Sequence, residues 1–362
     1  MFPNLKGIVQ ALLITISNLA GMNDPQYKVT PVGFLQMLLN NSTTATVSNL
    51  EALQLGLTKE IKVRYMQRGI DSDTTDVDDC ETNITAAWKE GSIGTASFSK
   101  IGIRIDDSLL RKLEENATQP FAMGSPATSL NIALYQTILT QINALTSKID
   151  KTLLAAQVGA WGKNPVTGLN TPQTVNFVNV PSINDGIVKL LSDYQFSEIA
   201  GTPQIVGNGS IVNYDIHQRL KVGIDNGGFG SNPVNVYPDP FSVSAWGANH
   251  FGLFVPGLTM FVDYLKNSGN FGGYKGGSYF FTFPVPVQLA NGTLTSLWFD
   301  AQLKYNDCPE KDAETGDVIT DRGWAILISK NYGLFNTPSD IYKTGDRLNG
   351  FNGSLHYIGT SV

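Results

Sequence analysis

Residues 59–105, KEIKVRYMQRGIDSDTTDVDDCETNITAAWKEGSIGTASFSKIGIRI, decide how the rest of the chain can be arranged. Apolar and charged side chains alternate from Ile61 to Tyr65, which is the period of a β-strand, and they alternate again in IGIRI, which ends at Ile105. A long polar stretch separates the two segments, so the pattern predicts a protruding hairpin. An isolated two-stranded ribbon is only marginally stable in water. A partner surface has to hold such a ribbon, and the hairpin therefore predicts an oligomer.

Charges of both signs are concentrated in this hairpin. Its first strand is basic, and its tip is acidic from Asp71 to Glu81. Copies related by symmetry could pair base to tip, through charges that set register more than affinity. Two other interpretations of the acidic run stay open, a solvated loop and a Ca²⁺ site, although its spacing departs from the EF-hand pattern. The candidate subunit-interface residues are Lys62, Arg64, Arg68, Asp71, Asp73, Asp76, Asp78, Asp79 and Trp88.

The composition agrees with a surface that other protein covers. Only 15% of the 362 residues are charged and 36 are glycine, whereas about 25% of residues are charged in an average soluble domain. Depletion of charge is typical of interface cores. The same profile excludes a coiled coil and a charge-rich disordered chain. The net charge of −6 excludes a protein that grips nucleic acid over a broad face.

A long helix is the second strong pattern. Ser125 is a good N-cap and Pro126 a good first helical residue, and no glycine or proline follows until Gly159. The pattern predicts a helix over 126–158, about 50 Å long at 1.5 Å per residue. Such a helix is a strut across the molecule. One apolar stripe along it steps by four, three and four residues, through Ile138, Ile142, Leu145 and Ile149.

Helices and strands in the remaining chain do not follow βαβ order, which predicts an α+β fold. The apolar segment 7–20 is interpreted as a helix that packs on the body rather than as a signal peptide, and no apolar run is long enough to span a bilayer. This helix is expected to bury Ile8, Leu12, Leu13 and Ile16. The predicted divisions are an N-terminal arm 1–58, an extended loop 59–105, a region 106–180 that contains the long helix, a central region 181–315, and returning strands 316–362.

Motifs for catalysis and cofactor binding are missing from the sequence. It contains no GxSxG, HExxH, Walker A or dinucleotide fingerprint. The two cysteines, Cys80 and Cys308, and the three histidines lack zinc-site spacing. We therefore predict a protein that is not an enzyme and that has no catalytic, cofactor-binding or metal-binding residues.

The order of these elements resembles the major capsid protein of tailed phages, the Hong Kong 97 fold. IKVRYMQRG, DVDDCETN and FSKIGIRIDDSLLRKL resemble capsid proteins of phages that infect Bacteroidetes, and TPQIVGNGSIVNYDIHQRL resembles the strand–turn–helix of the central domain in the same family. The resemblance implies that 61–105 is the extended loop over a neighbouring subunit. It also implies that 126–158 is the spine helix of a peripheral domain, and that residues around 180–315 form the axial domain.

The function that the resemblance implies is a structural one. The chain would assemble into pentamers and hexamers of an icosahedral shell around double-stranded DNA, which it would meet only by non-specific proximity. Scaffolding, portal and decoration proteins would be further partners, and no membrane would be involved. The protein would be located in the virion, after assembly in the cytoplasm of the bacterial host. The alternatives are an encapsulin-type compartment shell and a β-rich surface or carbohydrate-binding protein.

Overall fold

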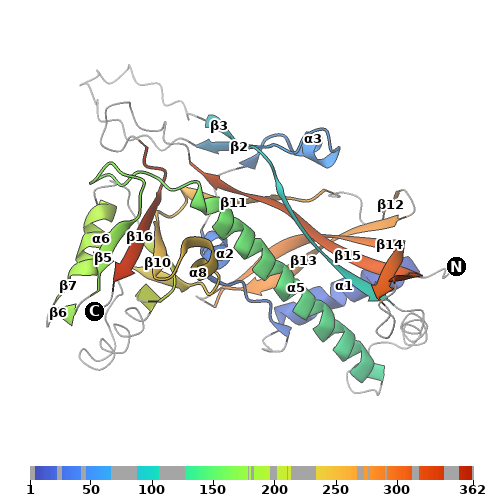
Figure 1. Cartoon of the computed structure of the whole chain (residues 1–362). Coiled ribbons are helices and arrows are strands. Elements are labelled where there is room, and N and C mark those ends of the chain that lie inside the picture. The colour runs from blue at the N-terminus through green and yellow to red at the C-terminus, as the bar shows by residue number, and fades with distance from the viewer. Residues whose placement is uncertain are drawn as a thin grey trace, which may run out of the picture.

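The computed structural model of the chain places helices and strands around one six-stranded sheet (Figure 1). Its elements do not alternate as βαβ, in agreement with the mixed α and β composition expected from the sequence. The structure describes residues 5–22, 27–41, 46–66, 88–105, 127–177, 179–180, 183–195, 202–209, 211–212, 234–266, 273–275, 278–289, 292–311, 318–337 and 350–360.

The six-stranded sheet is antiparallel and contains the two longest strands, which pair with each other from Asp300 to Lys311 on one strand and from Val318 to Ser329 on the other. Its third long strand, Ser278–Gln288, alternates buried and half-buried residues, because FFTFPVPV carries its large apolar groups at every second position. Pro284 and Pro286 lie where this strand is paired on one side only, and a proline without an N–H is tolerated at such an edge. The strand order is β11 (Thr259–Tyr264), β15 (Val318–Asn336), β14 (Leu294–Lys311), β13 (Ser278–Gln288) and β12 (Gly273–Lys275), with β4 (Ser97–Ile105) also paired to β15.

Helices α1 (Leu5–Gly21) and α5 (Ala127–Val158) pack their apolar side chains into one core with this sheet, and α5 crosses the molecule as a strut (Figure 1). The helix predicted over 126–158 is confirmed to within one residue at its start. All four residues of its stripe are buried. Leu12, Leu13 and Ile16 of α1 are buried as expected, whereas the side chain of Ile8 lies outside the described residues.

A second, five-stranded sheet has its own apolar core. It contains the strand QIV from the strand–turn–helix segment quoted above and the returning C-terminal strand. Helices α6 (Asp185–Gln195) and α8 (Ser242–Trp246) lie beside it in Figure 1. The strand order is β5 (Gln173–Asn176), β16 (Ser354–Thr360), β10 (His250–Phe254), β8 (Gln204–Gly207) and β9 (Asn235–Pro238), and a separate pair joins β6 (Asn179–Val180) to β7 (Ile183–Asn184).

The hairpin predicted from the sequence is real, but its returning strand is not the predicted one. Strand β2 (Ile61–Met66) pairs with β3 (Trp88–Ile93), whereas β4 pairs with β15 in the large sheet. The prediction that 98–105 returns beside 61–65 is therefore wrong. Alternation in IGIRI shows that the segment has two faces, but not which strand it joins, and the long apolar strand β15 offers more surface to pair with.

Several predicted features lie outside the described residues. These are the acidic tip, the part DDSLLRKL after Ile105 in FSKIGIRIDDSLLRKL, and the part NYDIHQRL at the end of TPQIVGNGSIVNYDIHQRL. The division of the chain into arm, loop, peripheral and axial regions stays a prediction. In the described part of the chain, no helix is both long and apolar enough to cross a membrane.

Candidate assembly interface

The ribbon β1 (Thr46–Val47), β2 and β3 is a sheet of its own with one apolar face. Its inner face is seated on the ends of β11 and β15, where Tyr65 and Phe335 lie with their ring centroids 5.4 Å apart. Figure 1 shows β2 and β3 beside this end of the large sheet. The body therefore supplies the partner surface that a small ribbon needs. The buried cluster at this junction comprises Leu53, Ile61, Val63, Tyr65, Met260, Val262 and Phe335.

Glycine permits the close contact between ribbon and body. A Cβ atom at Gly91 of β3 would lie 2.7 Å from the ring of Phe335, and one at Gly333 of β15 would lie 2.7 Å from Cδ1 of Ile93. Real Cβ atoms do not approach other atoms so closely. The two glycines thus let the backbones of β3 and β15 pack against large side chains of the opposite element.

We expect Gly91→Ala to loosen the ribbon. The added methyl group has to displace Phe335, and overpacking of this kind costs about 1–3 kcal/mol. Urea unfolding of the purified protein measures this loss. Gly94→Ala is the matched control, because a Cβ there meets nothing within 4 Å, and its stability should equal or slightly exceed the wild type. Equal stability of the two variants would contradict the seating of β3 on Phe335.

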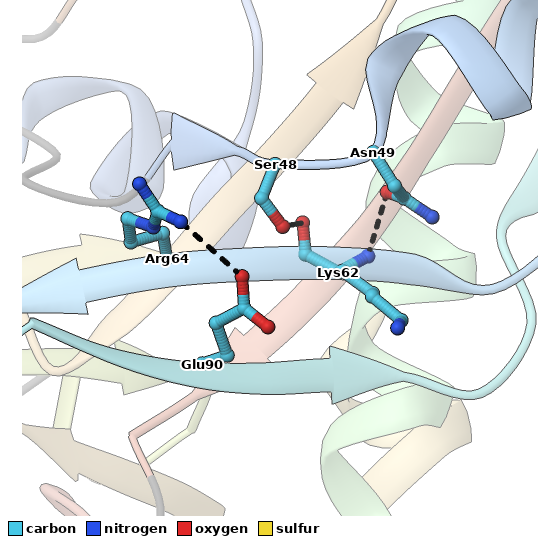
Figure 2. A network of polar contacts seen from close by, with 5 residues as sticks. All are labelled: Ser48, Asn49, Lys62, Arg64 and Glu90. Carbon is cyan, nitrogen blue, oxygen red and sulfur yellow. Dashed lines mark hydrogen bonds and ion pairs between the residues drawn. The ribbon is translucent and has the colours of Figure 1, made fainter.

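The outer face of the ribbon carries the charged side chains of Lys62, Arg64 and Glu90 (Figure 2), and all three are exposed. Nη2 of Arg64 lies 3.6 Å from Oε1 of Glu90, its partner across the ladder, and both side chains are more than half exposed. An exposed pair of this kind contributes at most about 1 kcal/mol. Trp88 is 51% exposed on the same strand as Glu90. Because neither feature stabilises the monomer much, this face is free to serve contacts with other molecules.

Asn49 fixes the edge of the ribbon (Figure 2). Its Oδ1 accepts the backbone N–H of Lys62 at 2.9 Å, and its Nδ2 donates to the backbone oxygen of Glu60 at 2.8 Å. The side chain thereby continues the ladder where β1 ends, and the N–H of Ser48 adds a bond to the oxygen of Lys62 at 2.9 Å. Helix α3 (Leu50–Gln54), which follows directly, is held against the ribbon by these bonds.

A turn after α3 exposes large apolar side chains. Leu55 is 67% exposed and Leu57 is 77% exposed, while Leu53 between them and the ribbon is buried. The sequence reasoning missed these residues and Glu90. The motif LQLGL, with two leucines around the φ > 0 residue Gly56, was a signal that could have found the leucines.

Three of the candidate interface residues are described. Lys62, Arg64 and Trp88 are brought together on the ribbon, with Lys62 and Arg64 exposed on alternate positions of β2. The other candidates lie outside the described residues and stay predictions: Arg68, Asp71, Asp73, Asp76, Asp78 and Asp79.

Two buried carboxyl groups hold the arm helix α2 (Gly33–Asn40) against the body. Oδ1 of Asp150 on α5 accepts the N–H of Leu35 at 2.7 Å, and Oδ2 of Asp239 accepts the N–H of Phe34 at 2.9 Å. Burial, and then the charge of Asp239, raises the pKa of Asp150 to about 9. A carboxyl group with this pKa is neutral at pH 7, and its side-chain contact with Asp239 favours the protonated form.

A histidine pair joins β10 to β16. Nδ1 of His250 lies 2.9 Å from Nε2 of His356, and the ring of His356 stacks on Trp161 at a centroid distance of 4.4 Å. Burial lowers the pKa of His250, and burial together with the neighbouring His250 lowers the pKa of His356 to about 4. Both rings are thus held neutral, one donating to the other.

The histidine pair makes this sheet sensitive to acid. An unfolded histidine has a pKa of about 6.5, so its stabilising effect in the fold is complete above that pH and falls as the pH drops towards about 4. We expect His356→Phe, which keeps a ring for Trp161 to stack on but cannot protonate, to reduce the loss of stability between pH 6.5 and 4. Urea midpoints measured across that window test this. An unchanged pH dependence would show that other groups cause the acid sensitivity.

The described ranges also bear on metal binding. There, no group of three or more His, Cys, Asp or Glu side chains is arranged to hold a metal ion. The Ca²⁺ interpretation of the acidic tip concerns residues outside those ranges.

Comparison with known proteins gives likeness at the level of structure only. No family model matches the chain, and no curated protein matches its sequence. A chain described as Mycobacterium phage Bobi has a TM-score of 0.39 and 10% identity, over 98% of this chain and 99% of that one. The capsid structure of Staphylococcus phage Andhra gives a TM-score of 0.33 and 7% identity, over 94% and 87%. A procapsid of satellite phage P4 that includes the size determination protein Sid gives 0.29 and 8%, over 98% and 91%.

These three neighbours come from phages, and two of them are described as capsid or procapsid structures. All three TM-scores are below 0.5, so the likenesses do not by themselves assign the chain to a family. None of the three is described as a phage of Bacteroidetes, and the resemblance to that group stays a prediction from the sequence.

Proposed function

We propose that this chain is the major capsid protein of a tailed phage, which assembles as pentamers and hexamers into an icosahedral shell around double-stranded DNA. The observation that carries the proposal is the two-faced ribbon. Its inner face is buried on the body, while its outer face presents Arg64, Glu90 and Trp88 to the surroundings. A ribbon anchored in this way displays a surface for a second copy without weakening its own subunit.

The rest of the molecule suits the same role. Helix α5 and the long strands β14 and β15 give a stiff frame, because all three contribute buried side chains to a single core. Stiffness matters in a shell, since a subunit has to keep its shape while its contacts with neighbours vary. The low fraction of charged residues and the exposed leucines after α3 fit a surface that other copies cover.

Electron microscopy of the purified protein tests the proposal, with the chain expressed alone and together with the products of neighbouring genes. Closed shells of uniform size are expected. Nuclease-protected double-stranded DNA in particles from infected cells separates a phage capsid from an encapsulin-type shell, which encloses protein. A chain that stays monomeric at high concentration under both conditions would overturn the proposal.

A further inference from the structure

A groove crosses the face of the large sheet that is turned away from α5. Two adjoining hollows of about 440 and 470 Å³ form it, and they share Phe98, Lys266 and Asn331. Gln302 and Lys304 line the second hollow, whereas Leu303 between them is buried in the core to which α5 contributes. We call the two hollows together the sheet groove. One end of it lies at Thr58 and Lys59, at the base of the ribbon.

The sheet groove is positively charged. Lys59, Lys266 and Lys304 line it, and within the described ranges none of the three has an ionic partner. The carboxylate that lines it, Asp300, is 3% exposed, and its Oδ2 already accepts the backbone N–H of Lys266 at 2.8 Å. Phe98 adds an apolar side chain that is 55% exposed. The groove therefore suits an acidic chain segment that also carries some apolar atoms.

This chain contains a segment with that chemistry. Residues 71–81, DSDTTDVDDCE, carry six carboxylates and no basic residue. They lie between the two strands of the ribbon, since Met66 pairs with Trp88 at its far end. Half of the segment 67–87, fully extended, spans about 35 Å, so the acidic residues can reach a neighbouring molecule.

The end of the ribbon at Met66 and Trp88 is the end further from the sheet groove of the same chain. Its base, at Lys59 and Ala96, borders the groove, and the N–H of Ala96 donates to the oxygen of Lys59 at 2.8 Å there. The pair Met66 and Trp88 lies at the opposite end, about 17 Å further along β2. The segment's length permits it to turn back over the ribbon to its own groove, but docking on a second copy needs no such turn, and the test below distinguishes the two.

We infer that the sheet groove is the docking site for the acidic segment 71–81 of a second copy of this chain. The inference rests on the proposed function and adds to it the surface that receives the segment. Three lysines facing six carboxylates make the contact dependent on ionic strength and set its register.

The chain's own thiol gives a direct test, because Cys80 lies in the acidic segment. In a Cys308→Ser background, Gln302→Cys places a second thiol in the groove without removing a lysine. Mild oxidation of assembled particles should then give disulfide-linked dimers and larger chains of subunits on non-reducing gels. Gln141→Cys on α5, with the same half-buried environment, is the matched control and should give none. Monomers that cross-link internally would contradict docking between copies.

Charge reversal tests the same contact by a second route. Lys266→Glu with Lys304→Glu should reduce assembly at least tenfold at physiological salt, whereas the exposed pair Lys6→Glu with Lys148→Glu should not. Adding Asp78→Lys and Asp79→Lys to the groove variant should restore assembly in part, since the segment then carries two lysines that can face the two carboxylates introduced in the groove.

The outcomes separate this inference from the proposed function. Wild-type shells together with groove variants that assemble normally would overturn the docking site and leave the capsid role standing. Groove variants that assemble normally but enclose less DNA would assign the groove to nucleic acid instead. A wild-type chain that forms no shells, together with a Gln302→Cys, Cys308→Ser variant that gives no cross-links to Cys80, would overturn both.

Discussion

Replacing residues 67–87 by the dipeptide Asn-Gly should abolish shells while the subunit stays folded. Met66 and Trp88 are paired directly across β2 and β3, and Asn-Gly is the preferred two-residue hairpin turn. The ribbon keeps its inner contacts with Phe335 and Met260, so its seating on the body is unchanged. Making the connecting loop about tenfold shorter lowers the entropy cost of closing it, worth up to ~2 kcal/mol of added stability. The replacement removes only the segment that connects the two strands beyond Met66 and Trp88.

Size-exclusion chromatography, electron microscopy and urea unfolding measure these two effects separately. The expected result is a monomer at least as stable as the wild type that forms no closed particles. As a control, an uncharged Gly/Ser sequence of equal length replaces the same segment. This variant separates the effect of the segment's charge from the effect of its length. Global unfolding of the shortened chain would show that 67–87 belongs to the core, and normal shells would exclude the segment from assembly.

Asp239→Ala should cost roughly 3–5 kcal/mol in the free energy of unfolding. Oδ1 of Asp239 accepts the N–H groups of Phe241 and Ser242 at 2.8 and 3.2 Å, while its Oδ2 accepts that of Phe34. Removing the carboxylate leaves these donors without a partner in a buried place, and each such group costs about 1–3 kcal/mol. Helix α2 has no capping side chain of its own at Val32 to replace it.

Asp150→Asn is the companion variant, with a different expected result. The amide oxygen can still accept the N–H of Leu35, and the wild-type carboxyl is neutral in the fold at pH 7. Because its folded pKa of about 9 exceeds the unfolded value of about 3.9, its contribution is complete below pH ~4 and is lost as the pH rises towards 9, by up to ~1.4 kcal/mol per pH unit. The variant should remove that slope and become relatively more stable at high pH.

Urea unfolding between pH 5 and 9 tests both variants. A small loss in Asp239→Ala would mean that water or a neighbouring group replaces the carboxylate. An unaltered slope in Asp150→Asn would mean that Asp150 is ionised in the fold.

Individual helices and strands were predictable from the sequence because the spacing of their apolar residues matches the period of a helix or of a strand. The helix ending at Val158 and the strand FFTFPVPV carry apolar groups at helical and strand spacing, and both are observed. In the strands β14 and β15, only the apolar parts SLWFDA and WAILIS carry a strand signal in the sequence. Their extensions DCPEK and VITDR lack the alternation that marks a half-buried strand, although they pair with each other.

Pairing and buried polar contacts were not predictable, because each depends on partners far apart in the chain. Residues 97–105 gave a strand but not its partner, Trp324–Tyr332. Asp150 follows the apolar residue Ile149 on α5 and is itself fully buried, and only the fold brings it to the N-terminus of α2. In the candidate interface, the alternation of Lys62 and Arg64 with apolar residues located the exposed face of β2, whereas Glu90 required the register of β3.

The short link between β3 and β4 has a mechanical consequence. Only residues 94–96 separate Ile93 in the ribbon from Ser97, the first residue of β4, which runs antiparallel to β15 as far as Ile105. A pull on the ribbon is therefore passed along the axis of β4. The hydrogen bonds of that pair lie across the axis, so the whole row shares the load in shear instead of opening one bond at a time. In the proposed shell, internal pressure that strains contacts between subunits would be borne by this row before it reached the cores.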